Sequence, residues 1–230
     1  MLIENDGFTY NLNNFKELMS HSNFDEKKVH RSKKGVRKQI IKTKFIESTW
    51  KGNKEEKQNS NFYRNYFIGE DSTKWKSKVK SVASIVLNDF YPDIDLIIDG
   101  RDSKLQYSFL LQKNTKSSKI KYKITGASSL KLKEDGSLAI GNRFGEIIES
   151  RPVAWNIINN KKVYVEVNFV LNGSIISFDF PNDYDHSSPL MIDPSISFYT
   201  FSGSTADNWG MTATPDNLSL IHISEPTRPY

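Results

Sequence analysis

Three aspartates in the segment FYPDIDLIIDG, residues 90–100, are the most site-like residues of the sequence. In an extended strand Asp93, Asp95 and Asp99 would share one face, because successive side chains alternate between the faces. Carboxylates grouped in this way could bind a cation or supply the acid and base of a hydrolase. A calcium loop needs closer polar spacing, and an acid and base pair needs a second carboxylate from another element. We therefore interpret the segment as a Tyr-Pro turn entering a strand with solvated aspartates, and cation binding stays open.

A second polar cluster lies in PNDYDHSSP, residues 181–189. It contains Asp183, Asp185, His186 and Ser187, the residue types of a hydrolytic triad. Triad residues converge from separate elements onto one reacting atom, whereas these four are neighbours in the chain. We therefore predict a loop held by aspartate turns rather than a catalytic centre.

The remaining histidines and the short motifs point away from known chemistry. His21 and His30 form no pair at metal-binding spacing, and the dinucleotide, phosphate-loop, zinc-protease and nucleophile-elbow motifs do not occur. The absence of cysteine excludes disulfides and thiol catalysis. We expect no catalytic, cofactor-binding or metal residues, no cofactor, and a protein that is not an enzyme.

Aromatic residues offer a different kind of site. A planar aromatic strip on a β-sandwich binds sugars, because ring faces stack against the apolar faces of sugar rings. Core packing is the competing use for most of these rings. The candidates for sugar stacking are Trp50, Trp75, Trp155 and Trp209, with Tyr63, Tyr66 and Tyr91.

Positive charge is concentrated near the start of the chain. Residues 1–80 carry 18 Lys and Arg against 10 Asp and Glu, and the densest run covers residues 26–44. Such a run could contact phosphate backbones. It lacks the interleaved aromatic residues that stack single-stranded bases, and lysine is abundant along the whole chain. We therefore expect no nucleic-acid partner, and no apolar run is long enough for membrane insertion.

Short alternating segments predict a mostly β structure. In residues 119–124 the apolar Ile120, Tyr122 and Ile124 alternate with lysines, and a single strand is expected over residues 162–171. Strands spaced by about 8 to 12 residues favour an antiparallel sandwich or barrel-like sheets over alternating β and α units. The fold class is therefore all-β, with a possible subdivision near residue 126.

Turn signals place the connections between these strands. Asn5-Asp6-Gly7 and the segment KEDGS, residues 133–137, are typical of hairpins, because Asp-Gly supplies positive φ angles. One short helix is expected over residues 13–21, and residues 51–61 are interpreted as a polar gap between strands.

Several segments, taken in order, resemble a bacterial protein family. The chain is similar to the β-rich N-terminal region that precedes seven-bladed β-propeller repeats of the SBBP type in secreted or cell-surface proteins, many of them cargo of type IX secretion. The turn after YSFLL departs from the family pattern, because QKNTKSS replaces a common Pro-Gly pair. The matching residues are Asn65 to Gly69, Lys74-Trp75, Tyr91 to Leu96, Tyr107, Phe109, Asp135-Gly136, Leu138, Pro152 and Pro189 to Pro194.

This resemblance implies a role and a location. We expect residues 1–194 to be an N-terminal module and residues 195–217 to begin the first propeller repeat. The implied function is a non-catalytic structural and interaction module of an exported surface protein, whose signal peptide is missing from this fragment. Its partners would be the downstream propeller repeats and a surface polysaccharide or protein. The alternatives are a carbohydrate-binding module and an accessory domain of a secreted hydrolase.

The last residues have a different expected origin. Leu218 to Arg228 coincides with one reading frame of the mosaic end of a transposase-based sequencing adapter. We therefore expect residues 218–230 to be an artefactual tail.

Overall fold

The chain forms strands and short turns, as its alternating sequence predicts. A computed structural model describes residues 2–13, 37–67, 69–100, 106–194, 196–200, 212–214 and 222–224. The helices in these residues are two single 3-10 turns, η1 (Ser72–Lys74) and η3 (Ser117–Lys119). Neither is long or apolar enough to span a membrane. The prediction of an antiparallel all-β fold is confirmed. The expected helix at residues 13–21 falls mainly outside the described residues, and Asn13 ends a strand.

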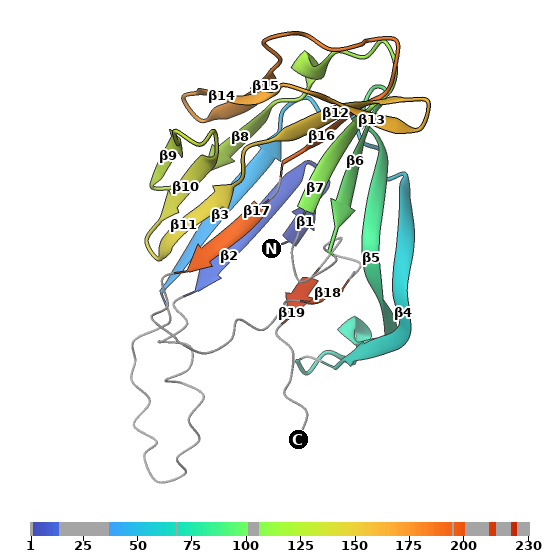
Figure 1. Ribbon diagram of the computed structural model, residues 1–230. Helices are drawn as coiled ribbons and strands as arrows, with labels where there is room; N and C mark the ends of the chain where they lie inside the picture. Colours follow the sequence, from blue (N-terminus) through green and yellow to red (C-terminus); the bar gives the residue numbers. More distant parts are fainter. Residues whose placement is uncertain are drawn as a thin grey trace.

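The strands of the described residues form three sheets, and each pairing between them is antiparallel (Figure 1). The eight-stranded sheet contains, in spatial order, β14 (Asn168–Asn172), β15 (Ile175–Asp179), β8 (Tyr122–Thr125), β3 (Lys38–Phe45), β2 (Gly7–Asn13), β1 (Leu2–Glu4), β19 (His222–Ser224) and β18 (Thr212–Thr214). The seven-stranded sheet contains β13 (Lys161–Val165), β12 (Val153–Ile158), β16 (Leu190–Asp193), β7 (Gln106–Leu111), β6 (Ile94–Asp99), β5 (Lys76–Tyr91) and β4 (Lys54–Tyr66). The four-stranded sheet contains β17 (Ile196–Thr200), β11 (Gly145–Glu149), β10 (Leu138–Asn142) and β9 (Ser129–Leu132).

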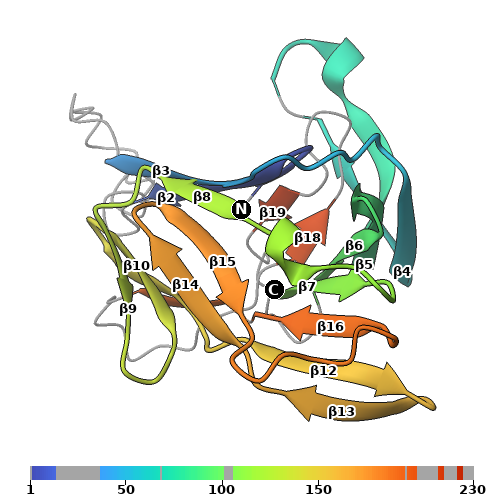
Figure 2. The same cartoon turned by 90° about the horizontal axis from the view of Figure 1, so that it is seen from above.

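The three sheets, whose arrangement is seen from above in Figure 2, share one core. Phe45 of β3, Phe109 of β7 and Ile140 of β10 belong to the same buried cluster, although each comes from a different sheet. The ring of Phe45 meets the ring of Phe109 edge to face, with centroids 5.8 Å apart. The described strands form no closed barrel. Near residue 126 the chain passes from β8 to β9, and therefore from one sheet to another.

Both predicted hairpin turns are present. β1 and β2 pair across Asn5 and Asp6, with Glu4 opposite Gly7. Gly7 approaches β3 so closely that an added Cβ would overlap the carbonyl oxygen of Thr43. In the turn from β9 to β10, Gly136 has φ +81° and its amide donates to the Lys133 carbonyl at 2.9 Å. The Asp135-Gly136 pair therefore supplies the expected positive φ, whereas Asn5, Asp6 and Gly7 have none and Gly7 is needed there for its close approach to β3.

Period-two alternation also correctly predicts which face of β8 is buried. Ile120, Tyr122 and Ile124 are buried, whereas Lys121 and Lys123 are exposed. One face of this segment joins the shared core and the other meets solvent.

The single strand expected over residues 162–171 is wrong, because the chain changes sheet there. It forms β13 at the edge of the seven-stranded sheet and β14 at the edge of the eight-stranded sheet. Val163 of β13 is consequently exposed, whereas Phe169 of β14 is buried. Alternation continues across the break, so the sequence pattern conceals the switch.

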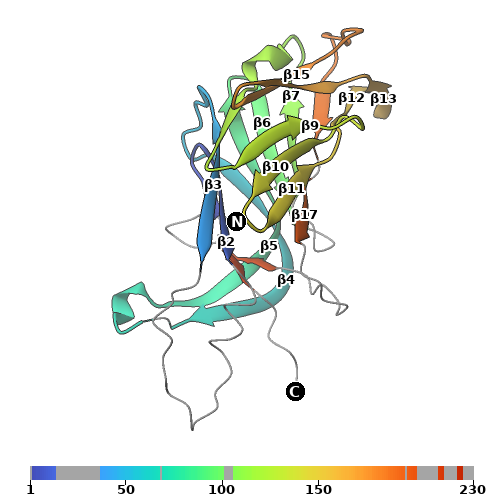
Figure 3. The same ribbon diagram turned by 90° about the vertical axis from the view of Figure 1, so that its left-hand side faces the viewer.

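The polar gap expected at residues 51–61 is also wrong. β4 begins at Lys54 and pairs with β5, with Lys54 opposite Leu87. As the edge strand of its sheet, β4 has only one strand partner and tolerates polar residues on its open side. Figure 3 shows the far ends of β4 and β5 turning away from the other strands and carrying η1 at their tip. We call residues 63–80, excluding Ile68, the β4–β5 arm.

Candidate functional site

The three predicted aspartates do not form one shared site. Asp93 lies in the turn between β5 and β6, with φ +64°, so strand alternation does not reach it. Asp95 lies on the outer face of β6 and accepts a 2.9 Å hydrogen bond from the backbone amide of Asp89. Asp99 lies on the same outer face at the end of the strand. Within the described part of the chain, no group of three or more His, Asp or Glu could hold a metal ion.

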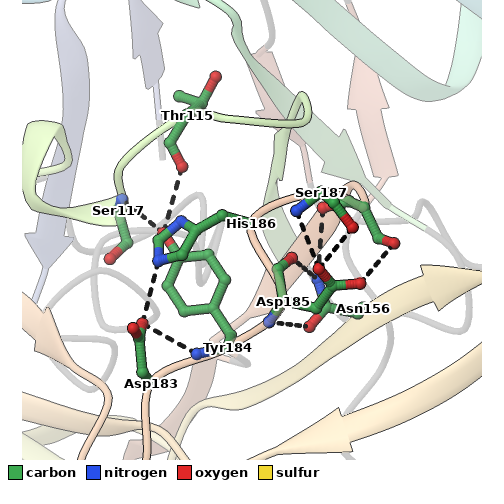
Figure 4. Close-up of polar contacts among 9 residues, drawn as sticks. Thr115, Ser117, Asn156, Asp183, Tyr184, Asp185, His186 and Ser187 are labelled. Carbon is green, nitrogen blue, oxygen red and sulfur yellow. Dashed lines mark hydrogen bonds and ion pairs between the residues drawn. The ribbon is translucent and has the colours of Figure 1, made fainter.

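The loop at residues 181–189 uses its polar groups to hold its own shape (Figure 4). Asp185 Oδ1 accepts bonds from the amide of Ser187 at 2.9 Å and its hydroxyl at 2.6 Å. The Ser188 hydroxyl donates to Asp185 Oδ2 at 2.7 Å. These bonds lower the pKa of Asp185, the Ser187 hydroxyl contributing most. The Ser187 hydroxyl is thus directed to Asp185 rather than to His186, so the triad geometry is not formed.

His186 and Tyr184 make further side-chain contacts of this loop. His186 Nε2 lies 3.1 Å from Asp183 Oδ1, and the centroids of the His186 and Tyr184 rings lie 4.2 Å apart. The Tyr184 hydroxyl accepts a 3.0 Å hydrogen bond from the backbone amide of Ser117 and donates a 3.2 Å hydrogen bond to the Thr115 carbonyl. These contacts join the loop to the segment that contains η3.

The buried side chain of Asn156 in β12 connects the loop to the seven-stranded sheet. Its amide nitrogen donates to the Asp185 carbonyl at 2.8 Å, and its oxygen accepts the Asp185 amide at 3.1 Å. A buried side chain that satisfies backbone groups on both sides fixes a loop firmly. The prediction of a loop held by aspartate turns is confirmed.

A buried carboxyl group that sequence reasoning missed lies in the core. Glu149 of β11 is only 1% exposed. Its Oε2 accepts hydrogen bonds from the hydroxyls of Tyr122 at 2.8 Å and Tyr107 at 3.2 Å. Burial raises the pKa of Glu149 to about 7, although the two tyrosine bonds oppose the shift. Burial, followed by the Glu149 charge, also raises the pKa of Tyr107 and of Tyr122.

This buried cluster draws on strands far apart in the sequence. Tyr107 lies in β7, Tyr122 in β8 and Glu149 in β11, so one residue comes from each sheet. A carboxyl group enclosed in the core cannot meet a substrate, and we assign it a structural role. Alternation gives no clear signal for it, because Glu149 shares its strand face with Ile147 while Glu146 shares the other face with Ile148.

Several of the predicted sugar-binding aromatics are used in packing. Tyr91 is buried, and Trp50 is half-buried against the core with its indole N–H donating to the Asn53 carbonyl at 2.8 Å. Trp155 of β12 faces Tyr164 of β13, with ring centroids 6.0 Å apart and planes tilted by 59°. Lys162 Nζ lies 3.8 Å from the Trp155 ring centre, so a cation covers that ring. Trp209 lies outside the described residues.

The β4–β5 arm presents the other aromatic surface. Phe67 is 60% exposed and Trp75 is 42% exposed, and their rings meet edge to face with centroids 5.4 Å apart. The Trp75 indole N–H donates to the Gly69 carbonyl at 3.1 Å. Tyr63, further along β4, is 56% exposed. Of the predicted residues, Tyr63, Tyr66 and Trp75 therefore lie on one projecting element, where Tyr63 and Trp75 are exposed and Tyr66 is half-buried.

Comparison with known proteins gives one match. A family model described as a domain of unknown function, DUF7948, matches residues 1–195. The chain belongs to the DUF7948 family. No curated protein and no solved structure matches it.

The DUF7948 match covers both described aromatic surfaces, the loop at residues 181–189 and the Glu149 cluster. Among these features, the loop and the Glu149 cluster stabilise the fold. The ring of Trp155 is covered by the side chain of Lys162. The arm of this DUF7948 domain combines open aromatic rings with an ordered backbone. It is therefore the candidate binding surface.

Proposed function

We propose that this DUF7948 domain is a non-catalytic structural and interaction module of an exported, repeat-containing bacterial surface protein. Several of its segments resemble, in the same order, the regions that precede β-propeller repeats in secreted proteins. This resemblance supports the proposals that the protein is exported and that propeller repeats follow the domain. The polar residues most like a catalytic set, Asp183 to Ser187, bond within their own loop, which supports a role without chemistry.

The observation that carries the interaction role is the exposed pair Phe67 and Trp75 at the tip of the arm. Large apolar side chains exposed together mark binding surfaces more often than isolated ones do. The two rings contact each other rather than the core cluster, because neither belongs to it. An arm that projects from the sheets can reach a partner without rearrangement of the core.

Carbohydrate binding is a specific form of this role that the aromatic residues favour. Tyr63, Phe67 and Trp75 are exposed in one hairpin, and sugar faces stack on such rings. The second aromatic surface, Trp155 with Tyr164, provides an internal comparison because it has a similar ring content in a different place.

Co-sedimentation with washed bacterial envelope fragments tests the proposed function. The 230-residue chain should pellet with the fragments, and the variant F67S/W75S should remain in the supernatant. The matched control Y164S removes an exposed ring from β13 and should pellet like the parent chain. Equal pelleting of the parent chain and F67S/W75S would overturn the proposed interaction role. The non-catalytic role would be overturned if the parent chain cleaved a polysaccharide and the variant Asp185→Asn did not.

A further inference from the structure

We propose that the β4–β5 arm binds an anionic polysaccharide, one whose sugars carry carboxylate or sulfate groups. This inference rests on the proposed interaction role and names the class of ligand. It depends on the positions of the exposed rings, the charge of the arm and the rigidity of its tip.

The exposed rings lie along one side of the hairpin. Tyr63 lies in β4 and Phe67 directly follows the strand. Exposure alternates from residue 63 to residue 67, which places both rings on the exposed face, about 13 Å apart at the rise of a β-strand. Trp75 touches Phe67, and Lys80 lies directly opposite Tyr63 in the strand register. Rings at this spacing can stack on two sugars of one extended chain, with an intervening sugar between them.

The charge of the arm favours a negatively charged ligand. Five basic residues lie among residues 63–80, against the two acids Glu70 and Asp71. Asp71 is paired with Lys74 at 3.4 Å. Lys76 and Lys78 form no ion pair within the described residues, and Lys78 is exposed. Lys76 lies opposite Tyr66, on the other face of the hairpin from Tyr63 and Phe67. Lys78, whose amide bonds to Asn65 between those two rings, is therefore the unpaired lysine that can attract a carboxylate or sulfate group of a chain stacked on them.

Hydrogen bonds among the described residues of the arm hold its tip in shape. Asp71 caps η1, accepting bonds from the Thr73 amide at 3.1 Å and its hydroxyl at 2.6 Å. Asn65 Oδ1 accepts a 2.9 Å hydrogen bond from the backbone amide of Lys78. Lys78 has φ +55°, and the register between β4 and β5 shifts at this point. A surface held by its own hydrogen bonds loses little conformational entropy on binding.

The ring geometry favours a polysaccharide over a single-stranded nucleic acid. The Phe67 and Trp75 planes are inclined by 64°. Successive bases stack with parallel planes, whereas the sugars of a polysaccharide turn relative to their neighbours and can meet inclined rings.

Titration calorimetry of the whole 230-residue chain at about 20 mM salt tests this inference. The probes are polygalacturonate, its fully methyl-esterified form, dextran sulfate, dextran and a 20-residue oligo-dT. We expect binding to at least one anionic polymer and at least tenfold weaker binding to its uncharged counterpart. The two charged polymers separate carboxylate from sulfate as the recognised group.

Two variants locate the site. K78S should weaken binding of the anionic polymer up to about fivefold, since an exposed ionic contact contributes up to about that factor. The control K123S removes the same charge from another exposed segment and should bind like the parent. F67S/W75S should also lose at least tenfold, and circular dichroism should show all three variants folded.

Three results would overturn the inference: equal affinity for the charged and uncharged polymers, tighter binding of oligo-dT, or equal affinities of K78S and K123S. If the chain pellets with envelope fragments through Phe67 and Trp75 but binds none of the anionic polymers, only the ligand class is wrong. The proposed interaction role would then stand.

Discussion

The hydroxyl of Tyr122 donates a 2.8 Å hydrogen bond to the carboxyl group of Glu149 inside the core shared by the three sheets. Burial favours the neutral acid, and the bond from Tyr122 favours the ionised one. The first effect is larger, because the pKa of Glu149 rises from an ordinary value of 4.5 to about 7.

The stability of the protein should therefore fall as the pH rises from about 5 to 8. A pKa raised in the folded state means that the folded protein holds its proton more tightly than the unfolded chain does. The stabilisation from this group is fully present below pH 4.5 and is lost as the pH rises through about 7. The pKa difference corresponds to about 3 kcal/mol of unfolding free energy.

Urea denaturation of the parent chain and Glu149→Gln at several pH values between 5 and 8 measures this effect. A glutamine side chain does not ionise, so E149Q should show a much flatter dependence and should exceed the parent in stability at pH 8. A parent and a variant with the same slope would show that Glu149 does not titrate in this range.

Tyr122→Phe should destabilise the protein by about 1–3 kcal/mol at pH 8, because it removes the shorter bond to a buried carboxylate. The comparison variant Tyr107→Phe removes the longer bond, of 3.2 Å, and should cost less. Both unfolding free energies come from urea denaturation. A larger loss for Y107F than for Y122F would contradict the assigned order of the two bonds.

Asn156→Ala should loosen the loop at residues 181–189. The change leaves the Asp185 amide and carbonyl without their partner and should cost about 2 kcal/mol of unfolding free energy. Hydrogen exchange should speed up at the amides of residues 185–188. The control Asn182→Ala removes an exposed bond to Glu166 and should cost less than about 0.5 kcal/mol. Unchanged exchange in N156A would show that the loop does not depend on this anchor.

Gly7→Ala should destabilise the β2 to β3 pairing by about 3 kcal/mol, because the new methyl group would overlap the Thr43 carbonyl. Gly173→Ala is the matched control. Gly173 has φ +61° but open space around it, so its change should cost only about 1 kcal/mol from backbone strain. Thermal unfolding of both variants measures the difference, and equal losses would mean that β3 can move to accept the methyl group.

Patterns that depend on neighbouring residues were predictable from the sequence. The turn at Asn5 to Gly7 and the buried face of β8 follow from local sterics and period-two alternation. The structural role of Asp185 also followed, because Asp and Ser at this spacing form turns within one segment.

Features that depend on which strands become neighbours could not be read locally. β4 is polar because it lies at a sheet edge, and the switch from β13 to β14 leaves alternation intact. The Glu149 cluster joins residues 107, 122 and 149, and alternation alone does not tell which glutamate faces inward. The exposure of Phe67 and Trp75 likewise depends on the arm leaving the sheet.

The central claim, that the arm is the binding surface, is tested most directly by the indole N–H signals in a proton–nitrogen NMR spectrum. The chain has four tryptophans and therefore four such signals, and Trp75→Phe assigns the one from the arm. On addition of the anionic polymer that binds in calorimetry, the Trp75 signal should shift or broaden while those of Trp50 and Trp155 stay in place. A shift confined to Trp155, with Trp75 unchanged, would place the binding surface on β12 and β13 and contradict the account.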